Sequence, residues 1–84
     1  MKTSTYFSLF AEFGTAHIPI TEIGRKYFGY SDSKSKTEAL KNNYPFPVFR
    51  IGGQKSIWVV DIAVVADYLD AAMDKAKKEW NSAR

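Results

Sequence analysis

The sequence predicts a mostly helical α+β fold, in which several helices pack with one two-stranded antiparallel hairpin. Apolar residues recur at helical spacing near both ends of the chain, which indicates amphipathic helices. Between them, in residues 46–60 (FPVFRIGGQKSIWVV), two apolar, β-branched or aromatic runs flank a Gly-Gly pair, a pattern typical of a hairpin. Eighty-four residues, 45% of them hydrophobic, suffice for one core but not for two. We therefore expect residues 1–84 to form a single domain.

The first helix is expected over residues 4–13, STYFSLFAEF, because its apolar residues form a broad stripe that ends at Gly14. Residues 17–20, HIPI, should be extended, since the proline disfavours helix before it. Most aromatic residues, Phe7 and Phe10 included, fall at spacings that suit a core. We therefore expect them to pack inside the domain rather than to stack on nucleic-acid bases.

Two further helices are expected before the hairpin. Thr21 is a suitable N-cap for the first of them, TEIGRKYF, which should end at Gly29. Ser31 or Asp32 can cap the next, which runs over residues 32–42. The two helices therefore follow each other after a short turn.

The helix of residues 32–42 is unusually polar, since only Ala39 and Leu40 are clearly apolar. A helix with so narrow an apolar stripe must present most of its surface to solvent. Lysines interleaved with small hydroxyl side chains are suited to phosphate contacts, and the tip of the hairpin carries similar basic and polar side chains. The candidate DNA-binding residues are Ser33, Lys34, Lys36, Thr37, Lys41, Arg50, Gln54, Lys55 and Ser56.

A long final helix, DIAVVADYLDAAMDKAKKEW, is expected to begin after an N-cap at Asp61. Its apolar residues keep a spacing of three or four along its whole length. They are Ile62, Val65, Leu69, Ala72, Ala76 and Trp80. The first half should cover the core, whereas the helical tail of about residues 73–84 outruns so small a domain and should fray or pack on a second subunit. Trp80 lies in this tail and is a candidate for contact with another chain.

The predicted order is helix, extended segment, helix, polar helix, hairpin and long helix. A helix-turn-helix followed by a β-hairpin is the layout of a winged helix-turn-helix domain. In such domains the second helix of the pair enters the major groove, and the hairpin, called the wing, reaches an adjacent groove or the backbone. We expect the recognition helix at about residues 32–42 and the wing at 50–56, with Thr37, Lys36 or Asn42 reading bases.

The charges are unevenly distributed, although the net charge is only +3. Residues 22–56 hold seven basic and three acidic side chains, whereas residues 57–74 hold four aspartates and no Lys or Arg. A basic middle beside an acidic helix suggests one face that meets polyanions. A solvated charged surface without a ligand is the alternative interpretation.

We expect no enzymatic activity and no cofactor or metal. The chain has no cysteine, and its one histidine, His17, sits beside an apolar run where a structural or surface role is the usual one. Three aspartates of the last helix, Asp67, Asp70 and Asp74, should face solvent and could form an acidic patch that contacts RNA polymerase. No stretch approaches a membrane span or a signal peptide, so we expect a soluble cytoplasmic protein without membrane association.

The segments FSLFAEFG, HIPITEIGRKYFGYS, FPVFRI, QKS and ADYLDA follow one another along the chain. In this order they resemble the pyocin activator protein family, the PrtN-like proteins of phage and phage-tail bacteriocin loci. The likeness covers about residues 5–72. More distantly, residues 18–69 are similar to the excisionase and MerR-type winged helix, in which a P-x-x-R-I-G strand precedes a basic turn and a helix that an acidic residue opens.

The resemblance implies a DNA-binding transcriptional activator of phage-like or bacteriocin genes, encoded by a bacterium or phage. Double-stranded DNA is the expected partner, and RNA polymerase is a further candidate. Two alternatives stay open: an excisionase-like protein that bends DNA for a recombinase, and a small protein-binding adaptor such as an antirepressor. Because single modules of this size seldom reach useful specificity alone, we expect a homodimer or several copies along the DNA.

Overall fold

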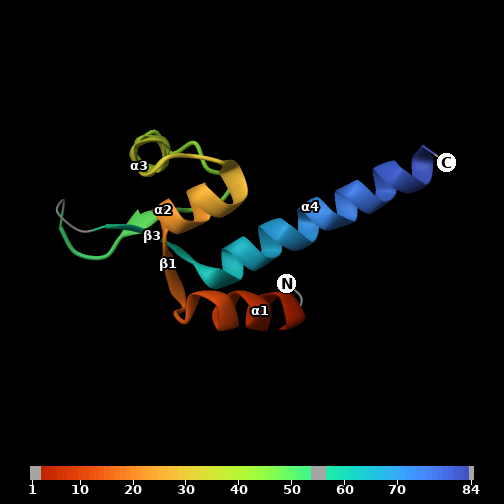
Figure 1. The fold of residues 1–84 in the computed structure, drawn as a ribbon, viewed down its shortest axis with the longest axis horizontal. Helices are drawn as coiled ribbons and strands as arrows, with labels where there is room; N and C mark the ends of the chain where they lie inside the picture. The colour runs from red at the N-terminus through yellow and green to blue at the C-terminus, as the bar shows by residue number, and fades with distance from the viewer. Residues whose placement is uncertain (1–2, 54–56, 84) are drawn as a thin grey trace.

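The computed structural model describes residues 3–53 and 57–83, and Gln54, Lys55 and Ser56 of the predicted wing lie outside them. The fold is α+β and mostly helical, as predicted (Figure 1). Its elements in chain order are α1 (Thr3–Phe13), β1 (His17–Pro19), α2 (Ile20–Ile23), a π-helical continuation η1 (Gly24–Phe28), α3 (Asp32–Leu40), β2 (Phe49–Arg50), β3 (Trp58–Asp61) and α4 (Ile62–Ser82).

The sheet has three antiparallel strands in the order β1-β3-β2. The expected hairpin is present as β2 and β3, in which Phe49 pairs with Val59. The structure adds β1 to it, because the extended segment after α1 pairs with the other edge of β3, with Ile18 opposite Val60. Both of these side chains are fully buried, so the third strand closes the core that the hairpin alone would leave open.

Helix α1 ends where the sequence predicts, at Gly14, whose φ of 72° lies in the left-handed region that glycine tolerates best. The inner side of α1 packs along α4 through buried Leu9. Phe7 and Phe10, which we expected in the core, lie on the surface instead and are 62% and 44% exposed. The expectation was wrong because α1 meets the domain on one side only, so its broad stripe is wider than the surface available to cover it.

The second helix begins at Ile20, one residue before the predicted helix, so the expected cap at Thr21 was wrong. Pro19 occupies the N-cap position and makes no side-chain cap bond. Ile20 and Ile23 are both buried, which holds this first turn against the core without a polar cap. The helix continues as η1 and ends at Gly29, with a φ of 69°, as predicted.

Helix α3 is capped by Ser31, one of the two predicted candidates. The Ser31 hydroxyl accepts a hydrogen bond from the backbone N–H of Lys34 at 3.2 Å. Only Ser35 and Ala39 of this helix are buried, so one narrow side of α3 packs against α2 and η1.

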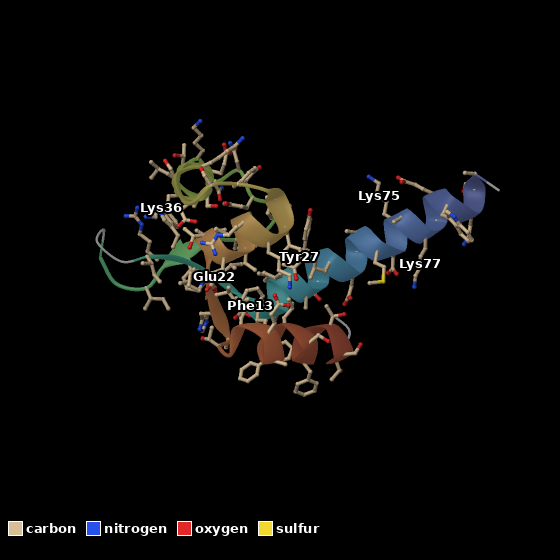
Figure 2. The ribbon with its side chains drawn as sticks, in the orientation of Figure 1. Phe13, Glu22, Tyr27, Lys36, Lys75 and Lys77 are labelled. Atoms are coloured by element: carbon tan, nitrogen blue, oxygen red, sulfur yellow. The ribbon has the colours of Figure 1, made fainter. Side chains whose placement is uncertain are left out.

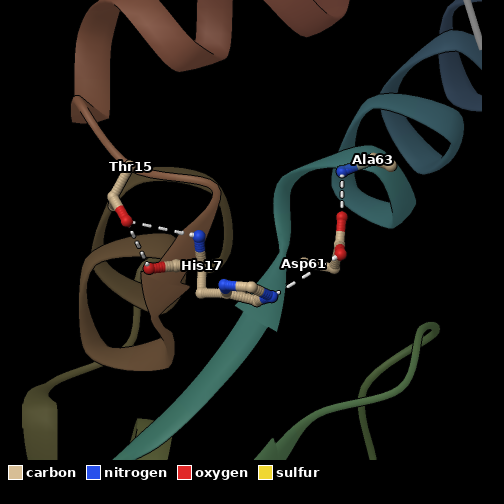
Figure 3. Close-up of polar contacts among 4 residues, drawn as sticks. All are labelled: Thr15, His17, Asp61 and Ala63. Carbon is tan, nitrogen blue, oxygen red and sulfur yellow. Dashed lines mark hydrogen bonds and ion pairs between the residues drawn. The ribbon is translucent and has the colours of Figure 1, made fainter.

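Asp61 caps α4, as predicted, and also lies beside β1. Its Oδ1 accepts a hydrogen bond from the N–H of Ala63 at 2.7 Å, and its Oδ2 lies 3.8 Å from Nε2 of His17 (Figure 3). The Thr15 hydroxyl in turn contacts the backbone of His17. The histidine therefore has the structural, surface position that the sequence indicated.

The two halves of α4 have different surroundings. Ile62, Val65 and Ala66 lie in the core, whereas every residue from 71 to 83 is exposed. Figure 1 shows this second half projecting away from the other elements, with the C-terminus at its far end. This exposed half of α4 gives the protein its length of 49 Å against 25 and 17 Å.

Candidate nucleic-acid interface

The buried side of α3 defines which of its residues face outward. Ser35 and Ala39, four residues apart, both lie in the interior. Two residues of an α-helix separated by two positions differ by about 200° around its axis. Thr37, midway between them in sequence, therefore projects almost directly away from the core. The outer face of α3 is centred on this threonine.

All five candidate residues of α3 and its C-cap are exposed, so this segment presents the polar surface that the sequence predicts. Three of them are lysines, placed around the outer face on both sides of the central threonine. The five are Ser33, Lys34, Lys36, Thr37 and Lys41. Their ammonium and hydroxyl groups are donors of the kind that phosphate oxygens accept.

Two contacts order this outer face. The hydroxyl of Thr37 donates to the carbonyl oxygen of Ser33 at 3.0 Å, which holds the hydroxyl along the helix. The ammonium of Lys34 lies 4.8 Å from the ring centroid of Tyr30, within range of a cation–π interaction. These contacts with Ser33 and Tyr30 therefore restrain the side chains of Thr37 and Lys34 before any ligand binds.

The acidic residues of α3 are engaged by neighbouring side chains. Asp32 forms an ion pair with Arg25 at 2.9 Å, and a Glu38 carboxylate oxygen accepts from the amide of Asn43 at 2.9 Å. These groups are near the ends of the helix or on its flank. Because Arg25 offsets the charge of Asp32, the three lysines outweigh the one remaining carboxylate, that of Glu38, in the field over the outer face.

Arg50, which we expected at the tip of the wing, lies within strand β2. It pairs with Trp58 across the two strands, and its guanidinium carbon is 4.4 Å from the centre of the Trp58 ring. The side chain is half-buried. Stacking on an aromatic ring holds a planar guanidinium in one orientation, so the base of the hairpin carries a positioned positive charge.

The remaining wing candidates, Gln54, Lys55 and Ser56, lie outside the described residues. The chain turns toward them at Gly52, whose φ of 101° is a conformation that residues with side chains rarely adopt. The predicted Gly-Gly signal thus has a clear backbone role at its first position.

Helix α3 and the β2–β3 hairpin lie at the same end of the molecule, and the projecting part of α4 lies at the other (Figure 1). The structure therefore brings the α3 candidates to the same end as Arg50, although they are far apart in sequence. Figure 2 shows Lys36 at this end and Lys75 and Lys77 at the opposite one.

Leu40 lies on the surface, which the sequence analysis did not predict. We counted it with Ala39 as part of the narrow apolar stripe, but Leu40 is 71% exposed and follows Thr37 by almost one turn. Apolar side chains beside polar base readers can contact the thymine methyl group. The signal was available in the spacing, since the one-turn partner of buried Ser35 is Ala39 and not Leu40.

The acidic patch expected on α4 is not formed as predicted, because Asp70 is buried. Only 7% of Asp70 is exposed, and its Oδ1 accepts a hydrogen bond from the Thr5 hydroxyl of α1 at 2.6 Å. Asp67 and Asp74 are exposed. The Asp70 carboxylate links α4 to α1 through this hydrogen bond, so its role is structural and it does not form part of an exposed acidic patch.

Within residues 3–53 and 57–83, no group of three or more His, Asp or Glu side chains is arranged to hold a metal ion. Over the same residues, none of the helices combines the length and the apolar character that crossing a bilayer requires.

These features define a small α+β protein that carries a polar, lysine-bearing helix on its surface. The family model for the pyocin activator protein PrtN matches residues 5–76 of the chain. The match covers most of the sequence, and the chain belongs to this family. The family is one of transcriptional activators of pyocin genes, and thus of regulatory proteins rather than enzymes. No curated protein and no solved structure matches the chain.

Proposed function

We propose that this protein is a winged helix-turn-helix DNA-binding activator of pyocin or related phage-like genes. In this proposal residues 1–84 act as one domain, α3 lies in the major groove, and the β2–β3 hairpin contacts the backbone or an adjacent groove. Such a regulator acts on the bacterial nucleoid in the cytoplasm, with duplex DNA as its partner and RNA polymerase as a second candidate.

The observation that carries the proposal is the outer face of α3. Lysine and hydroxyl side chains surround Thr37 on the side opposite the core, and all of them are exposed. Phosphate contacts by lysines supply affinity, while shorter polar side chains at the centre can reach base edges. The positioned guanidinium of Arg50 at the same end adds a second basic element.

Salt dependence tests for duplex binding directly. Fluorescence anisotropy with a labelled duplex from a pyocin promoter should give an affinity that falls steeply between low and moderate salt, because phosphate contacts release counterions. A protein-binding adaptor would show no anisotropy change with any duplex. That outcome would overturn the proposal.

Charge-matched variants locate the interface. Lys36→Ala on α3 should weaken binding to all duplexes and reduce the salt slope by about 1, as the loss of one phosphate contact does. Lys75→Ala removes the same charge at the far end of the molecule and should leave the slope unchanged (Figure 2). Arg50→Ala and Lys55→Ala should resemble Lys36→Ala, and an unchanged affinity in both would exclude the wing.

Sequence preference tests the central residues of the outer face. Thr37→Ala and Leu40→Ala should change which duplexes are preferred more than they change overall affinity, because base contacts carry the discrimination. Selection of bound sequences from a random library measures this. If both variants select the same sequences as the parent protein, α3 is not the reading element.

Activation and DNA bending need a separate measurement, because both would share the binding signature. A promoter–reporter assay should show transcription that rises with the protein and is lost in Lys36→Ala. Binding without any change in transcription, together with a strong bend in the duplex, would favour the excisionase-like alternative.

A further inference from the structure

The projecting part of α4, residues 71–83, is exposed along its whole length. A free helix of about a dozen residues is marginal in water, and most helices in proteins are stabilised by packing of one face. This segment continues the same helix whose first half packs in the core.

The apolar stripe of α4 does not stop where the domain stops. Ile62, Ala66 and Leu69 lie at alternating spacings of four and three, and the first two are fully buried in the core. The same alternation continues over the exposed part through Met73, Ala76 and Trp80. A stripe with this repeat is the seam along which two helices pack. Met73 is 46% and Trp80 60% exposed.

The sizes of the residues on this seam suit an antiparallel pair. Trp80 is large and lies near the C-terminal end, whereas Ala76 and Ala72 are small and lie toward the domain. If two copies cross at Ala76, the Trp80 of each lies over the Ala72–Met73 region of the other. A parallel pair would instead set one Trp80 ring against another and leave the alanines facing each other across a gap.

The charges along α4 favour the same orientation. Asp67 and Asp74 are exposed on α4, and Lys75, Lys77 and Lys78 follow them toward its C-terminal end. Antiparallel pairing about Ala76 brings Asp74 of one copy opposite Lys78 of the other, although it also sets Lys75 opposite Lys77. It also opposes the two helix dipoles. Parallel pairing would bring like charges together. Figure 2 shows Lys75 and Lys77 on opposite sides of the helix, so both flanks of the seam are basic.

We propose that the protein forms a homodimer through the antiparallel packing of residues 71–83 of two copies of α4. The interface lies at the end of the molecule opposite α3, so each protomer keeps its proposed DNA-binding face exposed. This inference does not depend on DNA binding, and it is tested without DNA. Because two segments of this length bury less surface than a standard interface, the expected dissociation constant is in the micromolar range.

The oligomeric state is measured by sedimentation equilibrium from about 1 μM to about 500 μM, the range in which a micromolar dimer dissociates. The parent protein should pass from monomer to dimer. Met73→Glu and Trp80→Glu should remain monomeric over the whole range while keeping the thermal unfolding of the core. Phe7→Glu is the matched control, since Phe7 is about as exposed as Trp80 but lies on α1, and it should dimerise as the parent does.

Cysteine cross-linking gives the orientation, because the natural chain has no cysteine. Ala76→Cys should form a disulfide-linked dimer under mild oxidation, since the two copies of residue 76 lie at the crossing point. Ala83→Cys should not, because antiparallel pairing separates the two copies of residue 83 by about 20 Å along the helix axis, far beyond disulfide reach. Efficient cross-linking of Ala83→Cys would overturn the antiparallel arrangement.

Two further outcomes would overturn the proposal. The first is that the parent protein stays monomeric at the highest concentration. The exposed apolar stripe of α4 would then bind a partner other than a second copy of this chain. The other is a dimer that persists in both Met73→Glu and Trp80→Glu, which would place the interface elsewhere, with the Phe7→Glu variant then the first to examine.

Discussion

Ser35 of α3 packs directly against Gly24 of the preceding helix. A Cβ atom placed on Gly24 would lie 2.1 Å from the Ser35 Oγ and 3.0 Å from its Cβ, both closer than side chains tolerate. The Tyr44 hydroxyl lies 3.4 Å from the same position and donates to the Ser35 carbonyl at 3.0 Å. The absence of a side chain at residue 24 therefore allows the two helices to approach closely, and this approach sets the position of α3.

Gly24→Ala should destabilise the protein by about 1–3 kcal/mol, the usual cost of overpacking a tight interior. The added methyl group would push α3 away from η1, so duplex binding should weaken as well. Urea denaturation measures the first effect. Gly53→Ala is the control, because a Cβ at that position meets nothing within 4 Å, and its stability should stay within about 0.5 kcal/mol of the parent.

Ser35→Ala provides the complementary variant. The Ser35 Oγ is fully buried and has no hydrogen-bond partner among the residues that the structure describes. Its removal should therefore leave stability unchanged or raise it slightly, since a buried hydroxyl without a partner is unfavourable. Combined with Gly24→Ala it should recover part of the lost stability. A double variant as unstable as the sum of the two would contradict the direct contact.

Asp70→Asn should lower stability by about 1.5–3 kcal/mol, the range for hydrogen bonds to charged groups. The Asp70 carboxylate is buried and accepts a hydrogen bond from the Thr5 hydroxyl at 2.6 Å. The substitution therefore weakens the contact between α1 and α4. Asp74→Asn makes the same change on the exposed part of the helix and should have little effect. Equal effects of the two variants would contradict a structural role for Asp70.

Asp61→Ala should cost about 0.5–2 kcal/mol, because the N–H of Ala63 loses the oxygen that caps α4. Asp61→Asn keeps a capping oxygen and should retain most of the stability. Thermal unfolding of the three proteins separates the cap from the charge. If both variants lost the same stability, the contact with His17 rather than the cap would be the important one.

Tyr44 should make the protein sensitive to high pH. Burial raises the pKa of its phenol above the usual 10.0. The folded state therefore holds the phenolic proton more tightly than the unfolded chain does. The resulting stability is complete below the unfolded pKa and is lost as the pH rises through the folded one. Urea midpoints measured between about pH 8 and about pH 11 should fall more steeply for the parent protein than for Tyr44→Phe.

Lys26 contributes in the same direction and needs its own control. Its hydrogen bond with Glu12 raises the pKa of the ammonium above 10.5, so the stability from this contact is also lost as the pH rises through that pKa. Lys26→Met removes that contribution. The difference between Lys26→Met and the double variant with Tyr44→Phe then isolates the phenol.

The local features of the fold could be predicted from the sequence because their partners are close along the chain. Ser31 and Asp61 cap helices by bonds to N–H groups two or three residues away. Gly14 and Gly29 end helices through their own backbone conformations. The hairpin and the long amphipathic helix follow from residue spacing alone. The polar outer face of α3 was predictable for the same reason.

The features that escaped prediction depend on what each residue meets from distant parts of the chain. Phe7 and Leu40 look like core residues by type, yet both are largely exposed in the part of the chain that the structure describes. Asp70 looks like a surface residue, but it is buried beside α1. The edge pairing of β1 with β3 joins residues that are forty or more positions apart. The exposure of Phe7, the burial of Asp70 and the pairing of β1 have no signal within one or two turns of the residues concerned. Leu40 is the exception, since the spacing of Ser35 and Ala39 indicates its exposure.

The sequence by itself therefore determined the helices, the caps of α3 and α4, the hairpin and the presence of a lysine-bearing polar helix, because these depend on spacing and on short-range hydrogen bonds. Only the tertiary structure decided that this helix and the hairpin lie at one end of the molecule and that the stripe of α4 continues into solvent at the other. Both are consequences of packing, since the close contact of Gly24 with Ser35 positions α3 and the small core ends before α4 does.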